Sequence, residues 1–222
     1  MATGFHPPLE EYLEAIHELE EEGVVVIQAR LAERVGHSAP AVHETVRKLE
    51  TDGYITIKDR ELSLTEQGRS RAESVVRKHR LAERLLTDII GLPWHLSHEE
   101  ACRWEHVISD AVEERLVILL NNPTTCPHGN PIPGTGALPD GQIALADVDS
   151  GARFRLERVT EAIEIDAASL AYLGENGFMP GAIGVVQTKT PDATLVVQLA
   201  SGSTLALGQA LTAHLFVTLV QE

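Results

Sequence analysis

Residues 28–65, QARLAERVGHSAPAVHETVRKLETDGYITIKDRELSLT, decide the fold of the first part of this chain. A short helical pattern ends at Gly36, and a second pattern follows in which Val42, Val46 and Leu49 share one face. Two short apolar segments on either side of the polar turn KDRE then predict a β-hairpin. Helix, turn, helix and hairpin in this order are typical of a winged helix-turn-helix, which binds DNA.

The flanking segments predict a mainly α protein with some β structure. Residues 8–22 have helical spacing, and residues 66–120 are almost entirely helical in pattern. Pro, Gly and Asn are concentrated in the following loop, and short strands with one helix near DAASLAYLG fill the last part, which fits a small β-barrel or sandwich. The predicted domains are a winged helix over 1–73, a helical region with a Pro/Gly linker over 74–140, and a β-domain over 141–222.

Composition bounds the class of protein. The chain has 222 residues and only two cysteines, which lie far apart and do not make a disulfide framework. No apolar run approaches the roughly 18 residues that a membrane span needs. The first residues, MATGFHPPLEEY, lack the charged start and apolar middle of a signal peptide. We therefore expect a cytoplasmic protein with reduced thiols and no membrane association.

The distribution of charge is unusual for a DNA-binding protein. The formal net charge is −15, whereas residues 30–71 are nearly balanced, with eight Lys or Arg and seven Asp or Glu. The predicted first helix is strongly acidic, and an acidic helix beside a DNA-reading helix would repel phosphates unless something positive neutralises it. A divalent cation bound by Glu11 would do so.

Candidate metal ligands are concentrated in residues 98–110, HEEACRWEHVISD. If this stretch is one helix, His98, Cys102, Glu105 and His106 lie at i, i+4, i+7 and i+8 and project from one face. Thiolate, imidazole and carboxylate together suit Fe²⁺, Mn²⁺, Co²⁺, Ni²⁺ or Zn²⁺, whereas Ca²⁺ and Mg²⁺ favour oxygen alone. The alternative is that Cys102 is a small buried apolar residue and the glutamates form a solvated face.

Two further pairs have ligand-like spacing. His79 and Glu83 lie at i and i+4 of an earlier helical segment, which strengthens the metal hypothesis. Cys126 and His128 are close in the sequence TTCPHGNP, but the surrounding Pro and Gly indicate a turn rather than a metal site.

Residues of the predicted winged helix are candidates for contacts with DNA. Basic side chains would meet phosphates, and the start of the second helix would face base edges. Glu44 either accepts a hydrogen bond from a cytosine amino group or is an exposed surface charge. The candidate DNA-binding residues are Arg30, Ser38, Pro40, His43, Glu44, Arg47, Lys48 and Arg60.

Three stretches carry a resemblance to a known family. RKHRLAERLLTDIIGL at 77–92, ACRWEHVISDAVEERLV at 101–117 and GNPIPG at 129–134 resemble the iron-dependent repressors of the diphtheria toxin repressor family. The resemblance implies a winged helix, a helical dimerisation domain and a C-terminal SH3-like β-barrel. It also implies a homodimer, with two dimers on one operator as a further option.

The same resemblance implies two metal sites per subunit. Iron-responsive members have a methionine at the position of Glu11, whereas manganese-responsive relatives have an acidic residue there and a second carboxylate one turn later, which Glu14 matches. Those relatives usually have Glu where this chain has Cys102. The regulatory site would comprise Glu11, Cys102, Glu105 and His106, with Glu14 as an additional ligand. The ancillary site would comprise His79, Glu83 and His98, with Asp166 and Ser169 as additional ligands.

These features together predict a transcriptional repressor, and not an enzyme, that is activated by a divalent metal. It would bind inverted-repeat operator DNA as a dimer and control metal uptake and homeostasis genes, with Mn²⁺ slightly favoured over Fe²⁺ as co-repressor. One alternative is an iron-dependent repressor of iron acquisition genes. Another is a metallo-hydrolase, which is disfavoured because no motif such as H-E-x-x-H supplies an open zinc site with a base. A third is a metal buffer that does not bind DNA.

Overall fold

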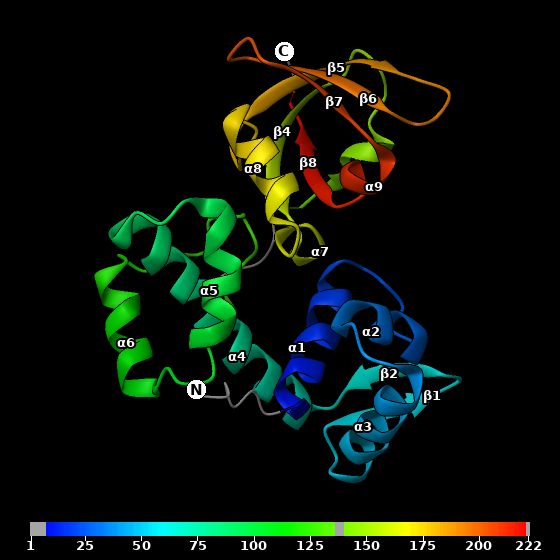
Figure 1. The fold of residues 1–222 in the computed structure, drawn as a ribbon, viewed down its shortest axis with the longest axis vertical. Helices are drawn as coiled ribbons and strands as arrows, with labels where there is room; N and C mark the ends of the chain where they lie inside the picture. Colours follow the sequence, from blue (N-terminus) through cyan, green and yellow to red (C-terminus); the bar gives the residue numbers. More distant parts are fainter. Residues whose placement is uncertain (1–7, 136–139, 221–222) are drawn as a thin grey trace. The chain divides into compact units, whose positions relative to one another are not determined.

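The computed structural model describes residues 8–135 and 140–220 (Figure 1). The chain divides into two compact units. Unit 1 comprises the residues up to 79 together with 102–114, and unit 2 comprises 80–101 together with the residues from 115 onward. Among the residues described, no helix is long and apolar enough to span a membrane.

Unit 1 contains the predicted winged helix-turn-helix. Its helices pack on one apolar core, in which Tyr12, Ile16, Leu31 and Val46 are almost completely buried. Burial of these side chains supplies the main stabilisation of the fold, at about 25 cal/mol per Å² of apolar surface. The elements are α1 (Pro8–Glu21), α2 (Gln28–Val35), α3 (Ala39–Thr51), β1 (Ile55–Lys58), β2 (Glu61–Leu64) and the first part of α4 (Glu66–Arg84).

Short-range signals explain where these elements end. Gly36 closes α2 in the left-handed conformation, with φ 66°, which glycine adopts without strain. In the wing, Lys58 pairs with Glu61, and the two residues between them have φ of 53° and 73°, as a two-residue hairpin turn requires. Ser38 occupies the N-cap of α3 but makes no capping side-chain bond. Pro40 in the first turn has no N–H to donate, which removes one of the usual partners.

The acidic helix α1 is neutralised by arginines of unit 1. Arg34 of α2 lies 3.0 Å from Glu18 and 2.7 Å from Glu22, and Arg69 of α4 lies 2.8 Å from Glu20. Part of the positive charge that we expected from a cation bound by Glu11 is therefore supplied by nearby guanidinium groups.

The segment predicted as one helix over 98–110 is broken. Helix α5 (Ser97–Trp104) ends before Glu105 and His106, which lie in a turn closed by a 2.9 Å bond from Val107 N to Trp104 O. Ser109 then starts α6 (Asp110–Leu119), because its hydroxyl accepts from the N–H of Val112. The prediction that all four ligands share one helical face was therefore wrong.

Unit 2 begins inside the long helix and contains the β-domain. Helix α4 continues as the π-helical turn η1 (Leu85–Ile90), which ends at Gly91, and the short η2 (Trp94–Leu96) leads into α5.

The β-domain is a six-stranded antiparallel, SH3-like sheet in the order β3-β8-β4-β5-β6-β7 (Figure 1). Phe154 and Phe178 pack edge-on in its core, with ring centroids 5.9 Å apart. The two shortest of these strands are β3, with two residues, and β7, with the four residues TLAL. The elements are β3 (Ile143–Ala144), η3 (Leu145–Asp147), β4 (Arg153–Val159), α7 (Glu161–Glu164), α8 (Ala167–Glu175), β5 (Ile183–Lys189), β6 (Leu195–Leu199), β7 (Thr204–Leu207), α9 (Gln209–Thr212) and β8 (Leu215–Leu219).

The predicted linker is an ordered loop where it is described; residues 136–139 lie outside the described part. Arg84 donates to the carbonyl of Thr125 at 2.7 Å and to that of Cys126 at 3.1 Å. Arg80 is fully buried, donates to the carbonyl of Pro131 and pairs with Glu161 at 2.6 Å. These bonds hold the loop against α4 and α7 and thereby position its side chains.

Candidate metal centre

Two clusters of ligand-type side chains are present, one in each unit. The first, which we call the regulatory cluster, comprises Glu10, Glu14, His79, Glu105 and His106 of unit 1. It brings together α1, α4 and the turn after α5.

Glu105 is the centre of the regulatory cluster. Its Oε2 accepts a 2.6 Å hydrogen bond from His79 Nδ1, and its Oε1 lies 3.0 Å from His106 Nε2. Glu14, His79 and Glu105 each offer a ligand atom within 4.8 Å of the others. Two carboxylates and an imidazole from three separate elements thus converge at a distance that one metal ion could span.

The titratable groups of this cluster are strongly perturbed. Burial and then the charge of Glu105 raise the pKa of Glu14 well above its ordinary value. Burial pushes the pKa of Glu105 upward, but hydrogen bonds from His106 and His79 outweigh it and lower this pKa. For His106, burial lowers the pKa, but the hydrogen bond and charge of Glu105 and the charge of Glu10 raise it overall. Crowded buried carboxylates favour a cation, because positive charge relieves their repulsion.

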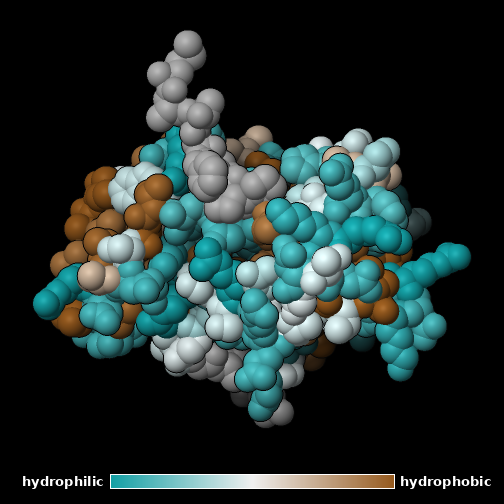
Figure 2. Space-filling model, turned by 90° about the horizontal axis from the view of Figure 1, so that it is seen from below, coloured by the Kyte–Doolittle hydropathy of each residue, from teal (hydrophilic) through white to brown (hydrophobic). Residues whose placement is uncertain are grey.

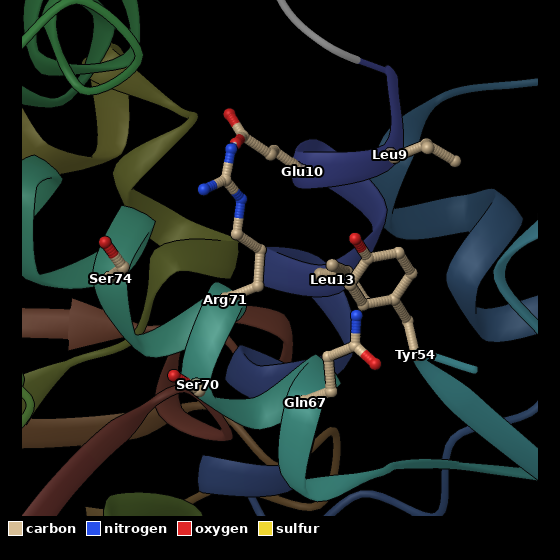
Figure 3. Close-up of a pocket in the computed structure, with 8 residues that line it drawn as sticks. All are labelled: Leu9, Glu10, Leu13, Tyr54, Gln67, Ser70, Arg71 and Ser74. Atoms are coloured by element: carbon tan, nitrogen blue, oxygen red, sulfur yellow. The ribbon is translucent and has the colours of Figure 1, made fainter. Parts of the chain in front are cut away.

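Glu10 connects this cluster to the surface. Its Oε2 accepts a 2.8 Å bond from His106 Nδ1, and its other oxygen pairs with Arg71 of α4. Figure 3 shows Glu10 and Arg71 pointing toward one another across a pocket between α1 and α4, which Tyr54 also lines. A carboxylate on the far nitrogen of a histidine fixes the orientation of the ring, a common arrangement behind metal-binding histidines.

The second cluster lies in unit 2 and comprises Glu83, His98, Cys126, His128 and Glu164. His128 Nδ1 is 3.1 Å from Glu83 Oε1 and 3.0 Å from Glu164 Oε2, and His98 Nδ1 is 3.2 Å from the same oxygen of Glu164. Glu83, Cys126 and His128 offer ligand atoms within 4.8 Å of one another. Asn130 orients Glu164 by donating to its Oε1 at 2.7 Å.

Burial governs the protonation of the second cluster. Burial, followed by the charges of Glu83 and Glu164, raises the pKa of the Cys126 thiol to about 12. Burial alone would lower the pKa of His128, but the charges of Glu164 and Glu83 raise it well above its ordinary value. Below the pKa of His128, the proton on its imidazole balances the charges of Glu83 and Glu164. A divalent cation would take the place of this proton.

In unit 1 the predicted metal ligands lie on α1, on α4 and in and after α5. His79, predicted for the ancillary site, is hydrogen-bonded to Glu105. Glu14 lies within 4.8 Å of Glu105 and His79, whereas Glu11 is half-buried on α1. Cys102 is half-buried at the end of α5, and its charge is among the influences that raise the pKa of Glu14.

The choice of ligands from the β-domain requires a correction. Asp166 is exposed at the N-cap of α8, where it accepts from the N–H of Ala168, and Ser169 donates to it at 2.6 Å. Asp166 is occupied as a cap, so neither residue reaches the cluster; the carboxylate beside His98 is that of Glu164. Cys126 and His128 do lie in a turn, but both side chains point toward Glu83.

Sequence reasoning missed Glu10 and Glu164. The only available signal for Glu164 was an acidic residue between two isoleucines, Ile163 and Ile165. Glu10 gave no signal, because it is one of many acidic residues on α1.

The candidate DNA-binding residues all lie on the exposed surface of the winged helix. The side of α3 that carries Val42 and Val46 is buried, which turns the opposite face to solvent. Arg60 is at the tip of the wing. The exposed residues of this surface include Arg30, Ser38, Pro40, His43, Glu44, Arg47, Lys48 and Arg60.

A winged helix joined to clusters of metal ligands defines the class of protein: a DNA-binding, metal-dependent transcriptional repressor, and not an enzyme. Three family models match: "Iron dependent repressor, N-terminal DNA binding domain" over residues 5–61, "Iron dependent repressor, metal binding and dimerisation domain" over 65–134, and "FeoA domain" over 143–219. The chain belongs to the iron-dependent repressor family, which includes the diphtheria toxin repressor.

Several known proteins are similar to this chain. The iron-dependent repressor IdeR of Mycobacterium leprae is 46% identical over 200 residues, covering 85% of this chain and 87% of the relative. The diphtheria toxin repressor of Corynebacterium efficiens is 47% identical over 182 residues, covering 78% and 79%. A solved manganese-dependent transcriptional repressor in complex with manganese has a TM-score of 0.86 at 30% identity, covering 96% of this chain and all of that one.

Proposed function

We propose that this protein represses metal uptake and homeostasis genes when Mn²⁺ or Fe²⁺ occupies two sites in each subunit. The observation that carries the proposal is the position of Glu105, which accepts from His79 and faces His106 while Glu14 lies within 4.8 Å. Glu14 of α1 and His79 of α4 thereby lie beside one carboxylate, so a cation bound there would tie the N-terminal helix to the rest of unit 1.

The donor set of the regulatory cluster favours Mn²⁺ slightly over Fe²⁺. Glu14, Glu105 and the imidazoles are oxygen and nitrogen donors, and Glu11 on the same helix stands where iron-responsive relatives have methionine. Oxygen-rich sites suit Mn²⁺, whereas the Cys102 thiolate favours softer ions. One of the similar structures is described as manganese-dependent and contains manganese, and two related structures of ScaR contain Zn²⁺ and Cd²⁺.

The second cluster supplies the second metal site in this proposal. Glu83, His98, His128 and Glu164 provide two carboxylates and two imidazoles, and Cys126 adds a sulfur. These donors are buried or nearly so. Burying carboxylates costs free energy, and a cation bound between them and the imidazoles would offset this cost. The Asn130 bond to Glu164 supports this role by orienting one ligand.

The protein would act as a homodimer on an inverted repeat, with one dimer or two on each operator. The family models include a dimerisation domain. The exposed apolar side chains of α6 are Val112, Ile118 and Leu119, and Figure 2 shows hydrophobic surface on the left of its view, the side on which Figure 1 draws this helix. Exposed apolar side chains on one helix fit burial against a second copy.

On DNA, the exposed face of α3 would enter the major groove. Arg47, Lys48 and Arg60 would contact phosphates, while Ser38, Pro40, His43 and Glu44 would face base edges. Binding of a cation by residues of α1 would shift the population toward the arrangement that matches the operator, because only differential binding moves such an equilibrium.

Anaerobic fluorescence anisotropy with labelled operator DNA tests this proposal. We expect tight binding with Mn²⁺ or Fe²⁺ and its loss with chelator. Binding that ignores chelator would contradict metal activation. Metal binding without any metal-dependent DNA binding would instead favour a metal buffer.

A further inference from the structure

We propose that Trp94 orients His128 in the second cluster and that Gly174 holds Trp94 in the required position. The inference deepens the proposed second metal site and rests on it. Neither of these two residues offers a ligand atom itself. Trp94 in η2 acts through its indole ring, and Gly174 in α8 acts through the space left by its lack of a side chain.

The first step is the contact between Trp94 and His128. His128 is fully buried, and its Nε2 lies 3.1 Å from the carbonyl oxygen of Trp94. The two rings also pack, with centroids 5.0 Å apart and planes inclined by 32°. A carbonyl oxygen can only accept a hydrogen bond, so the Trp94 carbonyl favours a proton on His128 Nε2. The lone pair of Nδ1 is then available to a metal ion. That nitrogen faces Glu83 and Glu164 at 3.1 and 3.0 Å.

The second step is what holds Trp94. Helix α8 packs against η2, and Trp94 packs on the apolar core of the β-domain. A Cβ added at Gly174 would lie 2.2 Å from Trp94 Nε1 and 3.1 Å from Cε2. Gly174 lies within a helix and not in a left-handed conformation, so its backbone would accept alanine without strain. The indole alone therefore requires glycine at this position.

The β-domain thus reaches the second cluster by two routes. It contributes Glu164 from α7, and it fixes His128 indirectly through Gly174 and Trp94. Metal affinity at this cluster should therefore depend on how α8 packs, even though α8 supplies no ligand. Partners that orient a metal-binding histidine typically change metal affinity by about 10- to 100-fold when they are altered.

The matched test compares Gly174→Ala with Gly208→Ala. Gly208 also lies in the β-domain, outside the left-handed region, and a Cβ there would meet nothing within 4 Å. Both changes are made in a full-length Cys102→Ala chain, in which thiolate-to-Co²⁺ charge-transfer absorption can arise only from Cys126. We expect Gly174→Ala to weaken Co²⁺ binding in this band by about 10- to 100-fold, and Gly208→Ala to leave it unchanged.

Two further measurements distinguish positioning from misfolding. Alanine normally stabilises a helix relative to glycine, so a lower melting temperature for metal-free Gly174→Ala would report the clash with Trp94. In the double variant Trp94→Phe, Gly174→Ala the smaller ring removes the clash, and Co²⁺ affinity should recover toward that of the parent. Recovery would show that Gly174 acts through Trp94 and not through the general stability of the domain.

The possible outcomes distinguish a failure of this inference from a failure of the proposed second metal site. Parent-like Co²⁺ affinity in Gly174→Ala would overturn the inference while leaving the second metal site intact. The absence of Cys126-dependent absorption in the Cys102→Ala chain itself would overturn the second site, and this inference with it. Loss of binding in both the Gly174→Ala and Gly208→Ala variants would assign the effect to the domain as a whole and would also overturn the role of Trp94.

Discussion

His79 donates a 2.6 Å hydrogen bond to Glu105, and both side chains are buried. The bond joins the middle of α4 to the turn that follows α5. Spacing along the sequence placed these two residues in different metal sites, because His79 pairs with Glu83 at i+4. The hydrogen bond brings His79 to Glu105 within unit 1 and leaves the predicted pairing of His79 with Glu83 open.

Glu105→Gln should therefore impair the regulatory cluster more than other single amide substitutions. An amide cannot replace the charged acceptor that His79 and His106 share, so we expect metal affinity to fall by at least 10- to 100-fold, with loss of operator binding at limiting metal. Metal-free stability should fall by about 1–3 kcal/mol, because buried donors lose a charged acceptor. Chelator-competition titration and urea unfolding measure the two effects. Glu113→Gln, which alters a partly exposed pair with Arg77, is the control and should leave metal affinity unchanged.

Glu10→Gln tests the carboxylate behind His106. Glutamine keeps the size of the side chain but removes the charge that favours the His106 Nδ1 proton. We expect about a 10-fold or larger loss of metal affinity with little change in fold. Glu20→Gln, on the same helix and paired with Arg69, is the matched control. If the two variants bind Mn²⁺ equally well, Glu10 has no part in orienting His106.

Two residues of α1, Glu11 and Glu14, are candidates for determining which metal ion the protein responds to. Because Glu14 lies within 4.8 Å of Glu105 and His79, Glu14→Gln should weaken Mn²⁺ binding more than Glu11→Gln. Glu11→Met should shift the response toward Fe²⁺, since a thioether is a softer donor. Anaerobic titrations of operator binding with each metal measure both effects. A Glu11→Met variant that responds to the two metals as the parent does would remove Glu11 as a selector.

The second cluster should bind metal more tightly as pH rises. The Cys126 thiol, with a pKa of about 12, and His128, with a raised pKa, must each lose a proton when they bind a cation. Each released proton contributes up to about a tenfold gain in affinity per pH unit. Co²⁺ titrations from pH 6.5 to 8.5 measure the slope, and Cys126→Ser should make it shallower. An unchanged slope would mean that Cys126 Sγ is not a ligand.

The stability of the metal-free protein, in contrast to the metal affinity, should decrease as pH rises. His128 has a raised pKa in the folded state, so its stabilising contribution is complete below the unfolded value of about 6.5 and is lost as pH rises through the folded value. Thermal melts with excess chelator should therefore give a falling melting temperature with increasing pH. His128→Gln should flatten this trend, and a parallel trend in the variant would assign it to other groups.

On DNA, phosphate-contacting and base-contacting residues should be separable. Arg47→Ala or Lys48→Ala should weaken binding to all sequences and reduce the slope of log affinity against log salt by about 1. Glu44→Gln should change which operator is preferred and leave that slope intact. Selection from a random DNA library measures preference, and an unchanged consensus would make Glu44 only a surface charge.

The winged helix could be predicted because its signals are short-range. The apolar spacing of Val42, Val46 and Leu49 and the break at Gly36 act within a few residues, so local conformation decides them. The break after Trp104 was missed because the apolar periodicity runs through it, whereas the cap at Ser109 that starts the next helix is a weaker signal. Because of that break, Glu105 and His106 do not share a helical face with His98 and Cys102.

By itself, the sequence determined the order of the elements, the class of protein and which types of ligand are present. Only tertiary structure decided which carboxylate meets which imidazole. Glu164 reaches His98, and His128 reaches Glu83, because Arg80, Arg84 and Asn130 hold a loop and a short helix in place. Spacing along a chain constrains neighbours on one element, whereas contacts between elements depend on packing and on the hydrogen bonds that buried polar groups must find.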